Sequence, residues 1–391
     1  MTPLSRRDWL KLSASAAALA PFPAFASSAP DSLNALAAAK GLRFGSCMGT
    51  GPSGAPRPSG DSGARANQYD DPRLRALFAR ECGVLVPENE LKWYAIRPNA
   101  TEFDFTRADR LMGFVADNGL LVRGHTLLWN RDVWMPAWTQ SYDFGPQPRA
   151  EAERLLTQHI AKVAGRYPQI FSWDVVNETI DPKTGEMEPS VFTRHIGPEV
   201  IDIAFHAARA AAPKAELVYN DYMSWGPGNA VHRAAVLKLL ERLKKNSVPV
   251  DALGVQAHIG PGASDSTNTL DGENEREWRK FLDAVTAMGL DVIVTELDYG
   301  DTALPGDVAV RDAMVASATG HYLDVMLSYK QLRYVMAWGL VDKYSWLRGL
   351  RPRADGMLKR PLPFDDDYRP KPMRDAIAAS FRAAPKRDWL A

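Results

Sequence analysis

The chain has little of what marks several classes of protein. Its 391 residues include only two cysteines, and 47 Lys plus Arg balance 47 Asp plus Glu, so the formal net charge is zero. This composition excludes a small disulfide-rich scaffold, a polybasic nucleic-acid binder and a disordered tail protein. No segment reaches the roughly 20 apolar residues that a membrane span requires. We therefore expect a folded, soluble protein with no nucleic-acid partner and no membrane anchor.

A metal-binding pattern is also missing. Neither a HExxH nor a CxxC motif occurs, and His195, His206, His232 and His321 are scattered along the chain. Zinc sites usually show such ligands at short, regular spacings. We expect no metal site and no cofactor.

The first 26 residues resemble an export signal. Arg6 and Arg7 precede a small, apolar run at residues 12–20, and Ala24-Phe25-Ala26 is similar to a cleavage site. An amphipathic N-terminal helix is the alternative. A bacterial twin-arginine signal implies a periplasmic or extracellular protein, with one domain at residues 27–391. In such a compartment Cys47 and Cys82 either form a disulfide or remain two buried thiols, and the sequence leaves both open.

Eight short apolar runs alternate with longer segments of helical periodicity. The runs begin 36 to 49 residues apart, at 42–48, 83–88, 121–129, 170–178, 216–221, 252–259, 291–298 and 334–340. The helical segments between them include 150–167, 199–212, 230–245 and 275–288. Strands joined by crossover helices are parallel, and eight such units predict an α/β fold of a single (β/α)8 TIM barrel. An open doubly wound sheet is the structural alternative. The Gly/Pro/Ser-rich stretch at 49–63 reads as a loop inserted after the first strand.

Polar and aromatic residues gather at the ends of the predicted strands. In a (β/α)8 barrel the C-terminal ends of the strands form the active-site face. Among them, Glu178 ends the fourth predicted strand, and Glu296 lies near the end of the seventh. Cleavage of a glycosidic bond requires two opposed carboxyl groups, one to donate a proton and one to attack the anomeric carbon or activate water. The pair therefore favours glycoside hydrolysis.

The strand-end motifs resemble those of glycoside hydrolase family 10, the endo-β-1,4-xylanases. They occur in order along the chain as Glu88-Asn89-Glu90-Leu91-Lys92-Trp93, Arg123-Gly124-His125-Thr126-Leu127-Leu128-Trp129, Asp174-Val175-Val176-Asn177-Glu178, Tyr219-Asn220-Asp221-Tyr222, Gln256-Ala257-His258, Thr295-Glu296-Leu297-Asp298 and Trp338-Gly339. The resemblance covers residues from about 42 to 377. It implies a retaining endo-1,4-β-xylanase that acts on xylan and xylo-oligosaccharides, and we expect a monomer.

The resemblance also implies roles for single residues. Glu178 would be the general acid and base, and Glu296 the nucleophile, with their carboxyl groups about 5 to 5.5 Å apart. His258, held by Asp298, would orient Glu296, while Asn177 and Gln256 would contact the sugar 2-hydroxyl and the nucleophile. The remaining predicted substrate-binding residues are Glu88, Asn89, Lys92, His125, Trp129, Tyr222, Trp338 and Trp346.

Three positions depart from the family's usual motifs. Asn130 stands where the family commonly has histidine, Met223 where it commonly has asparagine, and Ala257 where it commonly has serine. Two other functions remain open. One is a β-1,4-glucanase or mixed β-glycanase on the same scaffold, since xylose differs from glucose by lacking the hydroxymethyl group. The other is a barrel that binds sugar without cleaving it.

Overall fold

The computed structural model of the chain describes residues 29–51, 67–260, 270, 272–350 and 352–388. The predicted signal at 1–26 and most of the loop at 49–63 lie outside these residues. No helix within the described ranges is long and apolar enough to cross a membrane.

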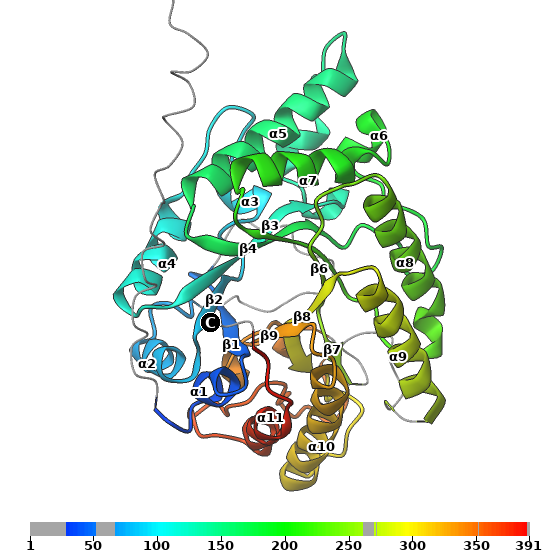
Figure 1. Cartoon of the computed structure of the whole chain (residues 1–391). Helices are drawn as coiled ribbons and strands as arrows, with labels where there is room; N and C mark the ends of the chain where they lie inside the picture. The colour runs from blue at the N-terminus through cyan, green and yellow to red at the C-terminus, as the bar shows by residue number, and fades with distance from the viewer. Residues whose placement is uncertain (1–28, 52–66, 261–269, 271, 351, 389–391) are drawn as a thin grey trace, which may run out of the picture.

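Nine parallel strands form one closed barrel (Figure 1). They are β1 (Arg43–Met48), β2 (Val84–Pro87), β3 (Leu121–Trp129), β4 (Ile170–Asn177), β5 (Glu216–Asp221), β6 (Ala252–Val255), β7 (His258–Ile259), β8 (Asp291–Tyr299) and β9 (Leu332–Ala337). From β1 to β6 each strand pairs with the next one in sequence, and β7 pairs with β8 and β8 with β9. β1 also pairs with β9, and β6 pairs with β8. These pairings leave no open edge, which confirms the (β/α)8 barrel and excludes the open doubly wound sheet.

The predicted sixth strand is interrupted in the structure. We expected one run at 252–259, but it divides into β6 and the two-residue β7 because Ala257 adopts a positive φ of 63°. β7 then pairs with the end of β8, where His258 lies beside Asp298 in the register. The barrel therefore has eight strand positions, and the sixth is divided between β6 and β7. After the interruption, His258 lies at the end of the barrel that carries the pocket.

Eleven α-helices are present in the described residues. They are α1 (Leu33–Ala38), α2 (Pro72–Glu81), α3 (Trp93–Ile96), α4 (Thr106–Asp117), α5 (Pro148–Arg166), α6 (Val191–Ile196), α7 (Val200–Ala211), α8 (Ala230–Lys245), α9 (Gly272–Ala287), α10 (Val308–Leu327) and α11 (Pro372–Ala383). Figure 1 shows the longer helices in a ring outside the strands. Local sequence sets their ends. The Ser190 side chain caps α6 in a reciprocal capping box with Thr193, and Gly289, with a φ of 73°, follows α9.

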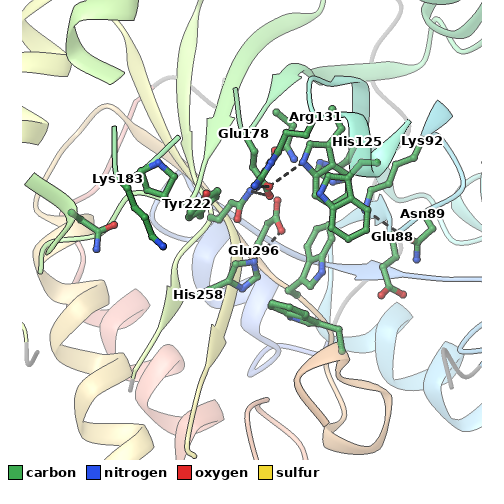
Figure 2. A pocket seen from close by; sticks show the side chains of 18 of the residues that line it. Glu88, Asn89, Lys92, His125, Arg131, Glu178, Lys183, Tyr222, His258 and Glu296 are labelled. Carbon is green, nitrogen blue, oxygen red and sulfur yellow. Dashed lines mark hydrogen bonds and ion pairs between the residues drawn. The ribbon is translucent and has the colours of Figure 1, made fainter. Parts of the chain in front are cut away.

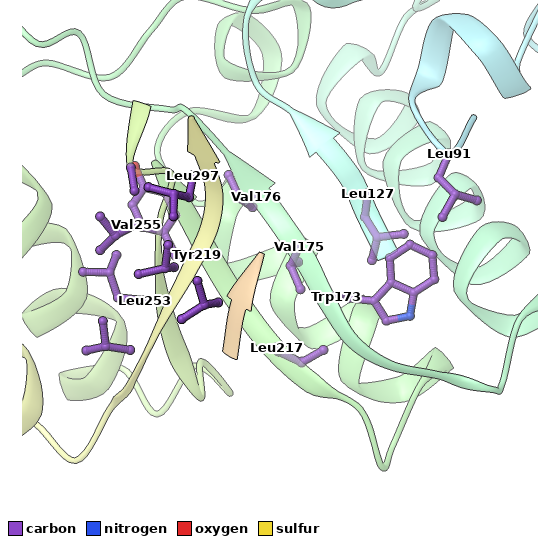
Figure 3. Close-up of a cluster of buried hydrophobic side chains, with 14 of the residues drawn as sticks. Leu91, Leu127, Trp173, Val175, Val176, Leu217, Tyr219, Leu253, Val255 and Leu297 are labelled. Atoms are coloured by element: carbon purple, nitrogen blue, oxygen red, sulfur yellow. The ribbon is translucent and has the colours of Figure 1, made fainter. Parts of the chain in front are cut away.

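Alternate residues of β1, β2, β5, β6, β8 and β9 enter two separate hydrophobic cores. Leu217 and Tyr219 of β5 pack between the strands and the helices (Figure 3), whereas Val218 belongs to a smaller cluster that also contains Val84 and Ile293. Successive strand residues point to opposite faces, so the smaller cluster fills the inside of the barrel. This packing holds the strand ends, and the polar residues on them, in a fixed arrangement.

The two cysteines lie in different cores. Cys47 of β1 belongs to the cluster inside the barrel, and Cys82, which follows α2, packs in the outer core. Both are buried free thiols. The barrel wall separates the two side chains. Of the two possibilities that the sequence left open, a disulfide or two buried thiols, the structure shows two buried thiols.

Candidate active site

Glu178 and Glu296 line the same pocket, which has a volume of about 400 Å³ (Figure 2). Glu178 follows the last residue of β4, and Glu296 lies in β8. The side chains are only 13% and 6% exposed, respectively. Glu178 has a positive φ of 50°, which is uncommon for a residue other than glycine and is typically kept where function needs a particular side-chain direction.

Two polar side chains contact Glu296, and Asp298 supports one of them. Nδ2 of Asn220 donates to Oε1 at 2.8 Å, and Nε2 of His258 lies 3.2 Å from Oε2. Nδ1 of His258 lies 2.8 Å from Oδ1 of Asp298. Both ring nitrogens thus face carboxylates, which accept hydrogen bonds only, so the geometry favours the imidazolium form of His258.

These contacts determine the protonation of Glu296. Burial alone would raise the pKa of its carboxyl, but the hydrogen bond from His258 and the nearby positive charges outweigh burial and lower the pKa. Burial acts in the opposite direction on His258 and would lower its pKa. The charges of Asp298 and Glu296 outweigh burial and raise the pKa of His258. Glu296 is therefore ionised near neutral pH.

Glu178 lies in a different environment. Nε2 of Gln256 donates to Oε1 at 2.8 Å, and Nε1 of Trp129 donates to Oε2 at 2.9 Å. Nη1 of Arg131 lies 3.4 Å from Oε2. Burial raises the pKa of Glu178, and the Gln256 hydrogen bond and the Arg131 charge offset this rise only in part. The two carboxyl groups of the pocket are thus shifted in opposite directions, the pattern that separates an acid from an ionised partner.

The amide residues are arranged differently from the expectation. We expected Asn177 and Gln256 to contact the sugar 2-hydroxyl and the nucleophile. In the structure Asn220 donates to Glu296, and Gln256 donates to Glu178. Oδ1 of Asn177 instead accepts from Nδ2 of Asn220 at 2.8 Å and lies 3.4 Å from Nε2 of Gln256. Asn177 thereby links the surroundings of the two carboxyl groups.

One end of the pocket is formed by residues after β2 and within β3. Nζ of Lys92, which is only 6% exposed, lies 3.5 Å from Oδ1 of Asn89 and 4.7 Å from the ring centre of Trp129. Gln68 donates to Glu88 at 2.8 Å. Nδ1 of His125 lies 2.8 Å from Oδ2 of Asp174, which also pairs with Arg123. These polar groups are held in place before any ligand binds.

Tryptophans form much of the wall. Trp338 is buried, and Trp346 donates from Nε1 to Oδ2 of Asp298 at 2.7 Å. Trp129 stacks on Trp134 with ring centres 4.2 Å apart. Flat apolar faces of this kind pack against the apolar faces of sugar rings.

The structure brings together the predicted site residues. All of them line the pocket except Asp298, which supports His258 and Trp346 from behind. Sequence reasoning missed Arg131, Trp134, Pro182, Lys183, Gly228 and Asn229, which also line it. These residues lie in loops and short 3-10 helices without a periodic pattern. Their only signal in the sequence was their position soon after the ends of β3, β4 and β5. Among the described residues, no group of three or more His, Cys, Asp or Glu side chains is placed to hold a metal ion.

Two of the three departures from the family motifs, at Asn130 and Met223, lie away from the pocket. Asn130 is fully buried, donates to Oγ1 of Thr179 at 2.8 Å and accepts from Oγ of Ser190 at 2.7 Å. Met223 packs in the outer core. Asn130 therefore fastens the loop after β4 to the loop after β3, and neither side chain faces a ligand.

Comparisons with known proteins agree with this geometry. The pattern of glycosyl hydrolase family 10 matches residues 32–380. Endo-1,4-beta-xylanase B of Thermotoga neapolitana is 31% identical over 309 residues, which span 79% of this chain and 83% of that protein. Endo-1,4-beta-xylanase 1 of Gibberella zeae is 31% identical over 307 residues, spanning 78% and 82%.

Solved structures give the same result. Xylanase 10B of Thermotoga petrophila in complex with xylobiose superposes with a TM-score of 0.76 at 28% identity, covering 92% of this chain and 99% of that one. Native xylanase 10B of Thermotoga maritima gives 0.75 at 29%, covering 90% and 98%. With the strand-end residues around one pocket and a match over most of its length, the chain belongs to glycosyl hydrolase family 10.

Proposed function

We propose that the protein is an endo-1,4-β-xylanase that cleaves internal β-1,4-xylosidic bonds of xylan with retention of configuration. The observation that carries this proposal is the pair of buried carboxyl groups facing one pocket with pKa values shifted in opposite directions. The names of the relatives, and the xylobiose in one solved neighbour, support xylan as the substrate class.

The first chemical step uses both glutamates. Glu178, protonated because burial raises its pKa, gives its proton to the glycosidic oxygen as the bond to the anomeric carbon breaks. The ionised Glu296 attacks that carbon from the opposite face and forms a covalent glycosyl-enzyme ester. The aglycone part of the chain then leaves with the proton.

The second step releases the sugar. Glu178, now ionised, removes a proton from water, and the water oxygen attacks the anomeric carbon while the bond to Glu296 breaks. Two inversions give net retention, and Glu178 regains its proton for the next cycle. The His258–Asp298 pair and Asn220 orient Glu296 and stabilise its charge in both steps.

The substrate binds on both sides of the carboxyl pair. Figure 2 shows Glu88, Asn89 and Lys92 toward one end of the pocket and Tyr222 and Lys183 toward the other, with Glu178 and Glu296 between them. The first group binds the glycone hydroxyls together with His125 and Trp129, and Tyr222 serves the aglycone side. Trp338 and Trp346 pack against the sugar at the cleavage site, where Asn177 meets the 2-hydroxyl. Binding residues on both sides suit cleavage within a chain.

Two measurements test this function. Rates on xylan and on carboxymethyl cellulose compare xylanase with β-glucanase activity, and we expect xylan to be hydrolysed much faster, with short xylo-oligosaccharides as products. Glu296→Ala should lose hydrolysis, and azide should restore turnover of an activated aryl xylobioside with an α-glycosyl azide as product. Unchanged hydrolysis in this variant would refute the nucleophile assignment, and an inactive parent protein would favour a sugar-binding barrel.

We also propose that residues 1–26 direct export by the twin-arginine route and that residues 27–391 act as a monomer without a membrane anchor. The Arg6-Arg7 pair and the Ala24-Phe25-Ala26 sequence support export. Replacing both arginines by lysine should keep the enzyme in the cytoplasm, whereas export of this variant would contradict the proposal. Sedimentation of the exported enzyme should give the mass of one chain.

A further inference from the structure

Arg131 connects the proposed acid to a second carboxylate. It lies in the loop that follows β3, and its guanidinium group reaches into the pocket beside Glu178 (Figure 2). Nη1 lies 3.4 Å from Oε2 of Glu178, and Nη2 lies 3.0 Å from Oε1 of Glu188, in the loop between β4 and α6. The Arg131 side chain is 28% exposed, while each glutamate is 13% exposed. One guanidinium group is therefore shared by two largely buried carboxylates.

The other groups around Glu178 are of two kinds. Trp129 and Gln256 are neutral donors whose hydrogen bonds do not change with pH. The acidic groups that act on Glu178 are Glu296 of β8 and Asp221 at the end of β5. The titratable groups that act on Arg131, besides Glu178, are Tyr222 after β5 and Glu188 and Asp181 in the loop after β4. Glu296 and Asp221 disfavour a negative charge on Glu178. Arg131 is the cation that favours a negative charge on Glu178, and Glu188 competes with Glu178 for Arg131.

We propose that Arg131 and Glu188 form a charge pair that sets the upper pH limit of hydrolysis by acting through Glu178. This inference rests on the proposed function, in which Glu178 is the proton donor. Both are positioning residues, because they act on Glu178 and not on the substrate. The pair suits a residue that must be an acid in the first step and a base in the second, since Arg131 supports the ionised form and Glu188 limits that support.

The two members of the pair should move the pH profile in opposite directions. Without the Arg131 charge, Glu178 keeps its proton to higher pH, so Arg131→Met should move the alkaline limb of kcat/KM upward by about one unit. Without Glu188, the whole Arg131 charge acts on Glu178, so Glu188→Gln should move this limb downward, on the order of half a unit. A role limited to holding the loop predicts a lower rate without opposite shifts.

The experiment is a set of pH profiles of kcat/KM on a xylo-oligosaccharide, whose sugar leaving group requires proton donation. The set comprises the parent enzyme, Arg131→Met, Glu188→Gln and the double variant. Arg131→Lys keeps the charge and should retain the parent limb. Arg149→Met removes a surface arginine that pairs with Glu153 on α5 at 3.0 Å and should also match the parent.

Each result decides the proposal. Opposite shifts, with the double variant matching Arg131→Met, would support it, because Glu188 then acts only through Arg131. An unmoved limb in Arg131→Met, or shifts of both single variants in the same direction, would overturn it. If Arg131→Met fails to fold, the downward shift in Glu188→Gln remains the test. A parent enzyme that does not cleave the oligosaccharide refutes the proposed function instead, so the two failures are distinguishable.

Discussion

Gly254 provides the space in which Asn220 reaches the proposed nucleophile. A methyl group added at position 254 of β6 would stand 2.3 Å from Oδ1 of Asn220 and 3.0 Å from Cγ2 of Thr295. Ordinary van der Waals contact begins near 3.4 Å, so Gly254→Ala should displace the Asn220 carboxamide by about 1 Å. A displacement of this size in a group that positions the reaction costs on the order of a hundredfold in rate. Nδ2 of Asn220 would then lose its hydrogen bond to Glu296.

The size of the effect follows from that hydrogen bond. A hydrogen bond to a charged group is worth about 1.5–3 kcal/mol, which corresponds to a loss of roughly ten- to a hundredfold in kcat/KM. Loss of this donor also raises the pKa of Glu296, so the acidic limb of the pH profile should move upward. The assay is kcat/KM against pH on an aryl xylobioside, with circular dichroism to confirm the fold.

The control is Gly113→Ala on α4, where an added methyl group meets no atom within 4 Å. This variant should keep the parent kcat/KM and pH profile. Asn220→Ser removes the same donor without crowding the barrel and replaces Gly254→Ala if that variant does not fold. Parent activity and an unmoved acidic limb in both Gly254→Ala and Asn220→Ser would refute the role of Asn220.

Three further predictions concern stability, orientation and redox state. Burial raises the pKa of Glu216 to about 7, above the unfolded value of about 4.3, so stability is full below the unfolded pKa and falls as pH rises through 7. Glu216→Gln should abolish that fall, a gain of about 4 kcal/mol at pH 8 in urea unfolding. An equal dependence of stability on pH in both proteins would contradict this. Asp298→Asn should destabilise the imidazolium form of His258 and lower kcat at least tenfold. An unchanged kcat in this variant would refute the role of the His258–Asp298 pair in the mechanism. Thiol titration of the denatured, unreduced protein should find both Cys47 and Cys82 free, and a count of zero would reveal a disulfide.

The barrel could be predicted from sequence because its strands are short apolar runs at nearly regular spacing. The expected runs at 121–129 and 216–221 agree with β3 and β5 residue for residue. The interruption of the sixth strand could not be foreseen, since Ala257 carries no glycine or proline signal for its positive φ. The positive φ accompanies the pairing of β7 with β8, a contact between segments about 40 residues apart that the local sequence does not encode.

The candidate site was predictable where the motif ends a strand and less so where loops contribute. Glu178, Glu296 and His258 follow from strand position and family resemblance. The contact of Asn220 with Glu296 depends on how the closed barrel brings β5 and β8 together, and strand order alone does not fix side-chain partners. Arg131 has no periodic neighbours, and its position between two carboxylates follows from the fold of two separate loops.

In the proposed mechanism Glu296 forms a covalent bond to the sugar during hydrolysis. The most direct measurement is mass spectrometry of the enzyme after reaction with a 2-deoxy-2-fluoro-β-xylobioside bearing a good leaving group, which slows release of the glycosyl-enzyme. We predict a stoichiometric mass increase that maps to the peptide containing Glu296 and is absent in Glu296→Ala. A label on another residue, or continued hydrolysis of xylan with inversion and no label, would contradict the proposed mechanism.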